Sequence, residues 1–223
     1  YYNILSLKCT LTNDINKDIS KQRWIVNNMA SLFDTLQAGA QRAGIMQQTK
    51  QSKNWFRKQV NALGDVSPRK LLKDDALEPS SKEIAGNMYM YFYDPKHKKT
   101  LPYYDRFPLV IMVEPAPGGF YGLNLHYLAP GVRARFLDAL METAPKKIGD
   151  KSRLKLRYDL LQSTKKFKEF QPCFKHYLNS QIKGTPVRVP MTDWEIAIFL
   201  PVEQFVKVKK ESVWRYSRKQ YNG

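Results

Sequence analysis

The chain has 223 residues, of which 43% are hydrophobic and 13% aromatic, so it is long and apolar enough to bury a core of domain size. No apolar run approaches the roughly 18 residues that a membrane-spanning helix needs, and we expect no contact with a membrane. The formal net charge is +17, and residues 146–223 hold 18 Lys and Arg against 7 Asp and Glu. A cationic block of this size favours nucleic acid, an acidic protein or an anionic surface as partner.

Cysteine and histidine are sparse. Cys9 and Cys173 predict two buried free thiols in a reducing compartment rather than a disulfide. His97, His126 and His176 lie apart from any Cys or His at metal-ligand spacing, so we expect no metal and no cofactor. The first residues, YYNILSLKCTLTND, lack the charge and apolar pattern of a secretory signal peptide.

The N-terminal part is predicted to be helical. Residues 1–12 suit a short strand or an arm, and apolar residues at helical spacing predict helices over 12–44 and 47–63, the second ended by Gly64. A short helix follows from Pro68. Residues 76–83, ALEPSSKE, read as a linker. We therefore predict a helical N-terminal extension over 1–80 and an α+β domain over 81–223.

Runs of β-forming residues begin after Gly86. They predict strands over 86–94, 107–114 and 119–128, and one or two more within 185–206. The run around Ile111 is apolar without interruption, so both of its faces should be buried. The strands predict a small antiparallel sheet, for which an SH3-like barrel is one arrangement.

A block of predicted helices, residues 130–182, separates the third strand from the later ones. It comprises a helix from Pro130, a second over 151–163 and a short third over 170–182. Periodicity does not decide between strand and helix for 192–206, and a basic helix ends the chain at 210–219. The predicted fold class is α+β: N-terminal helices and a small antiparallel sheet with a basic helical insertion at 130–182.

Nine Phe and Tyr rings lie between Tyr91 and Leu128. Most fall on strand positions, where a small sheet needs bulky residues for its core. Tyr103 and Tyr104 differ, because they lie in a loop bounded by proline, beside Asp105 and Arg106. These tyrosines either pack the loop down or, with Arg106, present a surface that binds a partner.

Patterns that carry enzymatic chemistry are missing. PAPGGFYG joins two predicted strands and opens no helix, so it does not indicate a phosphate-binding loop. A metal-dependent nuclease would need a cluster of acidic residues. The acidic candidates are Asp94, Asp105, Glu114, Asp193 and Glu195, with Asp193 and Glu195 expected on one side of a strand. Acidic residues beside turns usually cap or face solvent, so we expect no enzyme activity.

The strongest functional signal is a basic cluster in residues 146–168, which holds nine cations and two carboxylates. Such a cluster is either a solvated helix face or a surface that binds nucleic-acid phosphate or an acidic subunit. No base-reading motif accompanies it, so any DNA binding should be independent of sequence. The predicted nucleic-acid-binding residues are Lys146, Lys147, Lys151, Arg153, Lys155, Arg157, Lys165, Lys166 and Lys168.

Several segments resemble a conserved protein of large contractile-tailed bacteriophages, from the DNA end protector or head-completion group of virion proteins. They are MYMYFYDPKHKKTLPYYDRFPLVI, GGFYGLNLHYLAPGVRARFLDAL, KFKEFQPCFKHYL and DWEIAIFLPVEQFVK, and the resemblance runs from about Ser52 to Arg218. It implies a non-catalytic virion protein at the neck or tail, assembled in the host cytoplasm. The implied partners are other virion proteins, in a symmetric assembly, and double-stranded DNA.

Three functions remain open from the sequence. The first is a virion structural protein that also contacts DNA. The second is a purely architectural tail or baseplate component, whose charge meets acidic neighbouring subunits. The third is a metal-dependent nuclease.

Overall fold

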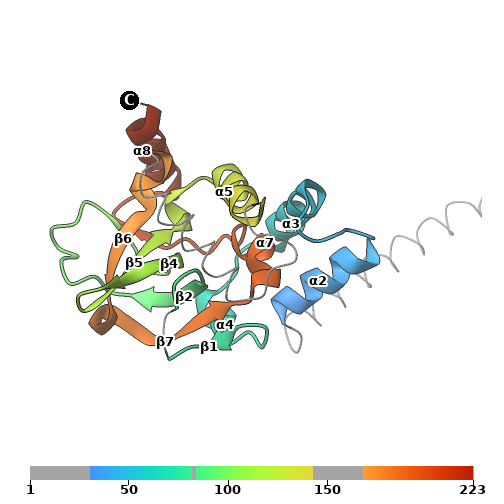
Figure 1. The fold of residues 1–223 in the computed structure, drawn as a ribbon, viewed down its shortest axis with the longest axis horizontal. Coiled ribbons are helices and arrows are strands. Elements are labelled where there is room, and N and C mark those ends of the chain that lie inside the picture. The colour runs from blue at the N-terminus through green and yellow to red at the C-terminus, as the bar shows by residue number, and fades with distance from the viewer. Residues whose placement is uncertain (1–30, 82–83, 143–167, 223) are drawn as a thin grey trace, which may run out of the picture.

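The computed structural model describes residues 31–81, 84–142 and 168–222. Helices and antiparallel strands are both present, which confirms the predicted α+β class (Figure 1). Within the described residues, no helix has the length and apolar character to cross a membrane. The predicted arm at 1–12, the first part of the helix over 12–44 and the helix over 151–163 lie outside the described residues.

Six strands form one antiparallel sheet in the order β1-β7-β2-β4-β5-β6. The edge strands β1 and β6 do not pair with each other, so the sheet is open and the SH3-like barrel is not confirmed. A second sheet has two strands, β3 and β8. The strand bounds are β1 Glu78–Pro79, β2 Met88–Tyr93, β3 Tyr104–Asp105, β4 Leu109–Ala116, β5 Gly119–Asn124, β6 Phe174–Leu178, β7 Ile182–Val189 and β8 Phe205–Val206.

The helices surround one face and one end of the sheet (Figure 1). The α-helices are α2 Leu32–Arg42, α3 Lys50–Leu63, α4 Pro68–Leu71, α5 Pro130–Glu142, α7 Trp194–Ala197 and α8 Lys210–Asn222. Short 3-10 helices are η1 Leu125–Tyr127, η2 Lys168–Cys173, η3 Asn179–Gln181 and η4 Met191–Asp193.

The predicted strands at 86–94 and 107–114 are confirmed by β2 and β4. The third predicted strand is confirmed up to Asn124, whose side chain accepts a hydrogen bond from the His126 backbone N–H and begins η1. Between β4 and β5 the chain turns at Gly118, which has a φ of 73°, so PAPGGFYG is a hairpin as expected. A Cβ atom at the next residue, Gly119, would lie 1.8 Å from the Tyr177 carbonyl oxygen.

The predicted helix over 170–182 is wrong. Only its two ends are helical, as the short 3-10 helices η2 and η3, and residues 174–178 between them form β6, which pairs with β5. Phe174 and His176 lie against Tyr121 on one face, with ring centroids 5.2 and 5.0 Å away. Tyr177 is buried on the other face. This alternation suits an edge strand, which forms because β5 offers it an unpaired edge.

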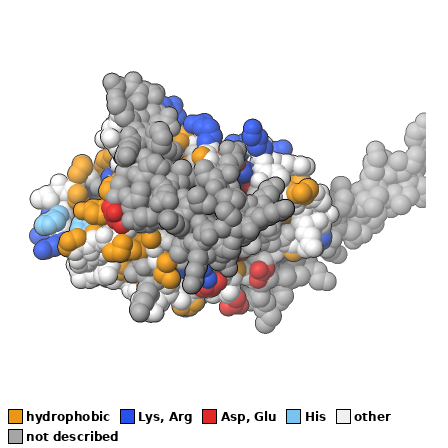
Figure 2. Space-filling model, viewed as in Figure 1, with side chains coloured by type: hydrophobic (Ala, Val, Ile, Leu, Met, Phe, Trp, Pro, Cys, Tyr) orange, Lys and Arg blue, Asp and Glu red, His pale blue; other side chains and the backbone are white. Residues whose placement is uncertain are grey.

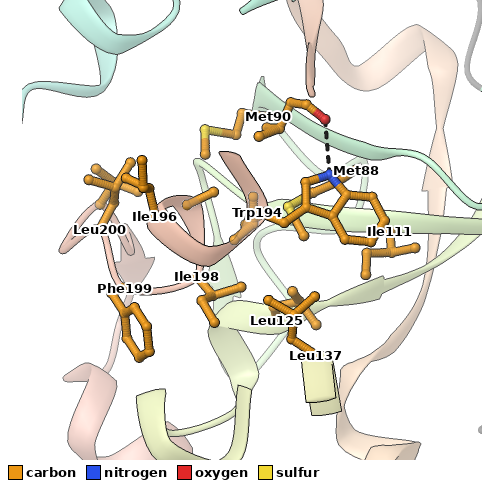
Figure 3. Packing of buried hydrophobic residues seen from close by; sticks show 14 of the residues in the cluster. Met88, Met90, Ile111, Leu125, Leu137, Trp194, Ile196, Ile198, Phe199 and Leu200 are labelled. Atoms are coloured by element: carbon orange, nitrogen blue, oxygen red, sulfur yellow. Dashed lines mark hydrogen bonds between the residues drawn. The ribbon is translucent and has the colours of Figure 1, made fainter. Parts of the chain in front are cut away.

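The segment that periodicity left undecided, 192–206, begins as η4 and α7 and ends as β8. Asp193 and Glu195 therefore lie at the start of a helix, and the prediction that they share one side of a strand is wrong. At the same place the Trp194 indole N–H donates to the Val189 carbonyl at 3.0 Å (Figure 3). This bond fixes α7 under the end of β7.

Residues 109–113 of β4 are buried on both faces, as predicted. Ile111 and Val113 belong to the large core, which includes Trp194 and the residues around it in Figure 3. Val110 and Met112 belong to a second cluster on the opposite face, built largely from tyrosine and phenylalanine rings. The members of this second cluster are Tyr89, Tyr91, Tyr93, Val110, Met112, Phe120 and Tyr177. Most of the aromatic stretch is therefore core.

Helices α2 and α3 also contribute to the large core, through Phe33, Leu36, Phe56 and Val60. Strand β1 also joins the N-terminal part to the sheet, because its Glu78 pairs with Arg188 of β7. The sequence predicted that this segment is a linker. The domain boundary that the sequence places at residue 80 stays a prediction.

Candidate nucleic-acid interface

The predicted basic cluster lies almost wholly outside the described residues. Lys146, Lys147, Lys151, Arg153, Lys155, Arg157, Lys165 and Lys166 fall between α5 and η2, and the backbone of Lys168 begins η2. Element η2 packs against α8. The cluster is therefore joined at its C-terminal end to a helix whose exposed side chains include Arg215, Arg218 and Lys219.

The three residues predicted to bind a partner lie on or beside β3. Tyr103 is half-buried, and its ring lies 6.2 Å from Tyr216 in a stacked arrangement and 6.0 Å from Tyr127. Tyr104 is half-buried and pairs with Val206, whereas Arg106 is exposed. Tyr103 thus packs the loop onto α8, while Arg106 is free to reach a partner. Their role in partner binding stays a prediction.

A buried polar network holds this region in place. The Asp105 carboxylate lies 2.7 Å from His126 Nδ1 and accepts hydrogen bonds from the backbone N–H groups of Phe107 and Gln204 and from the Asn124 amide. Both Asp105 and His126 are buried. His126 stands alone in the sequence, because its partner lies 21 positions away. The network joins β3 to the end of β5 and to the segment before β8.

The exposed loop between β2 and β3 is rich in lysine. It carries Lys96, Lys98 and Lys99 and one carboxylate, Asp94, which bonds to Lys98 Nζ at 2.9 Å. This bond and the nearby charges of Lys183 and Arg106 lower the pKa of Asp94. Figure 2 shows blue and pale-blue side chains at the left edge of the molecule, over this loop.

One ammonium group holds the loop. Lys207 has a φ of 71°, and its Nζ donates to the carbonyl oxygens of Lys98, Lys99 and Leu101 at 2.9, 3.1 and 2.7 Å. Because its ammonium group donates to three backbone carbonyls, the Lys207 side chain holds the loop in place and is not available to bind a partner.

Replacing Lys207 by Met should therefore loosen the loop without unfolding the protein. A loss of about 1 kcal/mol of local stability predicts roughly fivefold faster trypsin cleavage at Lys96, Lys98 and Lys99, measured by mass spectrometry. The matched control is Lys209→Met, which removes an exposed cation two residues away. Equal cleavage rates in the two variants would show that the Lys207 hydrogen bonds do not stabilise the loop.

A buried charge pair, Arg133 with Glu203, lies beside α8, and the Arg133 guanidinium is 5.7 Å from the centre of the Trp214 ring. Arg133 is 0% exposed and donates to the Leu128 and Ile198 carbonyls at 2.8 and 3.1 Å, and to the Glu203 carboxylate at 2.5 Å. Trp214 of α8 donates from its indole N–H to the His126 carbonyl at 2.9 Å. The basic C-terminal helix is thus held rigidly beside β3 and η2.

The chain matches a known protein family over nearly its whole length. The family model of the Phage T4 terminal DNA protecting protein matches residues 3–221.

The chain belongs to this family.

The match confirms the resemblance to a bacteriophage DNA end protector. It spans the basic cluster at 146–168 and the β3 region as well as the sheet. No curated protein and no solved structure is significantly similar to the chain.

In this member of the terminal DNA protecting family, the acidic residues considered for a nuclease do not gather. Asp94 pairs with Lys98, and Asp105 lies in the buried network. Asp193 accepts from the Gln37 amide at 3.1 Å, and Glu195 accepts from Ser52 Oγ at 2.9 Å. Glu114 lies half-exposed on β4 beside a register shift. Within the ranges that the structure describes, no group of three His, Cys, Asp or Glu side chains is arranged to hold a metal.

Cys173 is a buried free thiol, as predicted, and burial raises its pKa to about 12, so it is inert as a nucleophile. Cys9 lies outside the described residues. A set of exposed cations that no sequence motif indicates lies around α4 and consists of Arg69, Lys70 and Lys73.

Proposed function

We propose that this protein binds the ends of linear phage DNA within the virion and shields them from exonucleases, without catalysis of its own. The observation that carries the proposal is membership, over residues 3–221, of a family described as DNA protecting. The net charge of +17 supports it, because DNA offers a dense row of phosphates to such a surface.

The proposed DNA-binding surface is the basic cluster at 146–168, continued by the exposed cations of α8. The last residue of the cluster, Lys168, begins η2, and η2 contacts α8. The contacts should be to phosphates, because the sequence contains no base-reading motif. We therefore expect binding that is independent of DNA sequence and strongly dependent on salt.

We further propose that the protein works at the neck or head-completion position and contacts neighbouring virion subunits. Tyr103, Tyr104 and Arg106 are the candidate contact residues, and the exposed Arg106 suits an acidic neighbour. A purely architectural tail or baseplate component is the alternative. A metal-dependent nuclease is the second alternative, and the separate settings of its five candidate carboxylates argue against it.

The test of the proposal is a protection assay. Linear duplex DNA is mixed with the protein and then with an exonuclease, and the fraction of intact DNA is measured at several salt concentrations. We expect protection at low salt that fades as salt rises. Incubating the protein with DNA and Mg²⁺ alone should leave the DNA intact, whereas cleavage would support the nuclease.

The variant Lys151→Gln, Arg153→Gln, Lys155→Gln should weaken binding to all DNA sequences alike. It should also flatten the plot of log affinity against log salt by up to about three units, because each phosphate contact contributes close to one. The matched control is Lys50→Gln, Arg57→Gln, Lys58→Gln, which removes three exposed cations of α3. If the wild-type protein shows no salt-sensitive DNA binding, the architectural alternative is the better reading.

A further inference from the structure

A small cavity lies beside α4, at the lower edge of the molecule in Figure 1. Its volume is about 360 Å³. The side chains that line it are Arg69, Lys70, Leu72, Lys73 and Phe92. Four of these come from α4 and the turn after it, and Phe92 comes from β2. None of these lining residues belongs to the basic cluster or to β3.

The cavity is positively charged and its cations are uncommitted. Arg69, Lys70 and Lys73 are exposed, and none of their side chains has a hydrogen-bond or ion-pair partner among the described residues. Lys183 is exposed and pairs across from Phe92 in the β2–β7 register, so it lies on the same face of the sheet. No carboxylate lines the cavity. Its charge therefore suits an anion with several oxygen atoms, such as phosphate.

The inner wall of the cavity is apolar and aromatic. Phe92 and Leu72 are half-buried, and the Phe92 ring packs against the Phe107 ring, with centroids 5.0 Å apart and planes tilted by 53°. A half-buried ring held by a neighbouring ring is a platform on which a flat aromatic group can stack. Phosphate-binding cations around an aromatic platform are the two halves of a nucleotide-binding site.

The size of the cavity suits a single nucleotide. Its volume of about 360 Å³ is at the small end of the range of roughly 300–1,000 Å³ typical of ligand pockets. An internal base must leave the stack and its pairing to enter such a pocket, which costs a few kcal/mol. A base at a frayed end has lost most of these contacts already.

We propose that the cavity beside α4 binds the terminal nucleotide of a DNA end. The base stacks on Phe92, and the terminal phosphate is bound by Arg69, Lys70 and Lys73. This inference rests on the proposed function, and it explains how a surface that reads only phosphates distinguishes an end from the interior of a duplex.

The experiment compares two DNA molecules of the same sequence by fluorescence anisotropy. One is an open duplex with 5′-phosphates, and the other is closed at both ends by hairpin loops. We expect the wild-type protein to bind the open duplex about tenfold more tightly, the size of effect that one stacked base contributes. The variant Arg69→Gln, Lys70→Gln, Lys73→Gln should bind the two within about twofold of each other.

Two comparisons separate a specific site from bulk charge. The α3 control, Lys50→Gln, Arg57→Gln, Lys58→Gln, loses the same charge and should keep the preference for ends. Phe92→Leu should lose much of the preference while Phe92→Tyr keeps it, because only the second retains a ring. Thermal unfolding of each variant verifies that the fold is intact.

The outcomes also separate this inference from the proposed function. If the wild-type protein binds neither DNA, the proposed function fails. If it binds both with equal affinity, DNA binding stands and the end site is overturned. The end site is equally overturned if the α4 variant keeps the full preference.

Discussion

The substitution Ile111→Asp is expected to unfold the protein. Ile111 is 0% exposed at the centre of β4, pairs with Met88 and Leu123 on the neighbouring strands, and lies beside the Trp194 indole in Figure 3. A carboxylate at this position has no described donor to compensate for its lost hydration. The cost is on the order of 5 kcal/mol, which is comparable to the whole stability of a typical domain.

Urea unfolding followed by circular dichroism measures this effect. Ile111→Val, which removes one methylene group, should cost only about 1 kcal/mol. Thr185→Asp places the same carboxylate on an exposed position of β7 and should change stability by less than about 1 kcal/mol. A soluble Ile111→Asp protein that unfolds cooperatively near the wild-type midpoint would show that β4 is not central to the core.

The second large effect is expected at Arg133. Replacing it by Met removes the nearer cationic partner of the buried Glu203 carboxylate, whose other partner is Lys210 at 3.5 Å, and leaves the Leu128 and Ile198 carbonyls without their described donor. Breaking a buried pair on one side costs about 3–5 kcal/mol, because the remaining charge stays buried. Urea unfolding at neutral pH measures the loss.

The same pair predicts a pH dependence. Burial alone would raise the pKa of Glu203, but the charges of Arg133 and His126 and the hydrogen bonds it accepts lower the pKa to about 2 from an ordinary value of 4.5. A carboxylate with a lowered pKa in the folded state stabilises the protein above pH 4.5, and this contribution is lost as the pH falls toward 2. Its full size is on the order of 3 kcal/mol.

Glu203→Gln tests this dependence. The variant should be less stable than wild type at pH 7, and the difference in unfolding free energy should shrink between about pH 4.5 and 2. A difference that stays constant across this range would mean that the Glu203 charge does not contribute. Exposed Glu211→Gln is the control, since its removal should leave the acid profile unchanged.

The sequence predicts the central strands because their signals are local. Residues 88–93 and 109–116 are runs of β-forming residues between prolines and glycines, and no pairing partner needs to be known to recognise them. The strand at 174–178 fails this test. It has five residues with only partial alternation, and it is a strand because β5 has a free edge beside it. That edge comes from residues about 55 positions earlier, outside any local window.

The candidate sites divide along the same line. A dense run of charge, such as 146–168, is visible in the sequence without any structure. The cavity beside α4 is not, because sheet pairing brings Lys183 opposite Phe92, and packing brings Phe92 beside Arg69 and Lys73. His126 and Asp105 are likewise joined only by the fold. The run of aromatic residues is visible in the sequence, but the residues that contact it come from distant segments of the chain.

The position of β7 in the sheet sets the order in which the protein can fold during synthesis. Strands β2, β4 and β5 are consecutive in the sheet and close along the chain, so this meander can form once residue 124 has left the ribosome. Strands β6 and β7, which flank it on either side, are made some 50 residues later. Until then both sides of the meander offer unpaired backbone to other chains. Overproduction should therefore yield aggregates that decrease at lower temperature or with a chaperone that binds nascent chains.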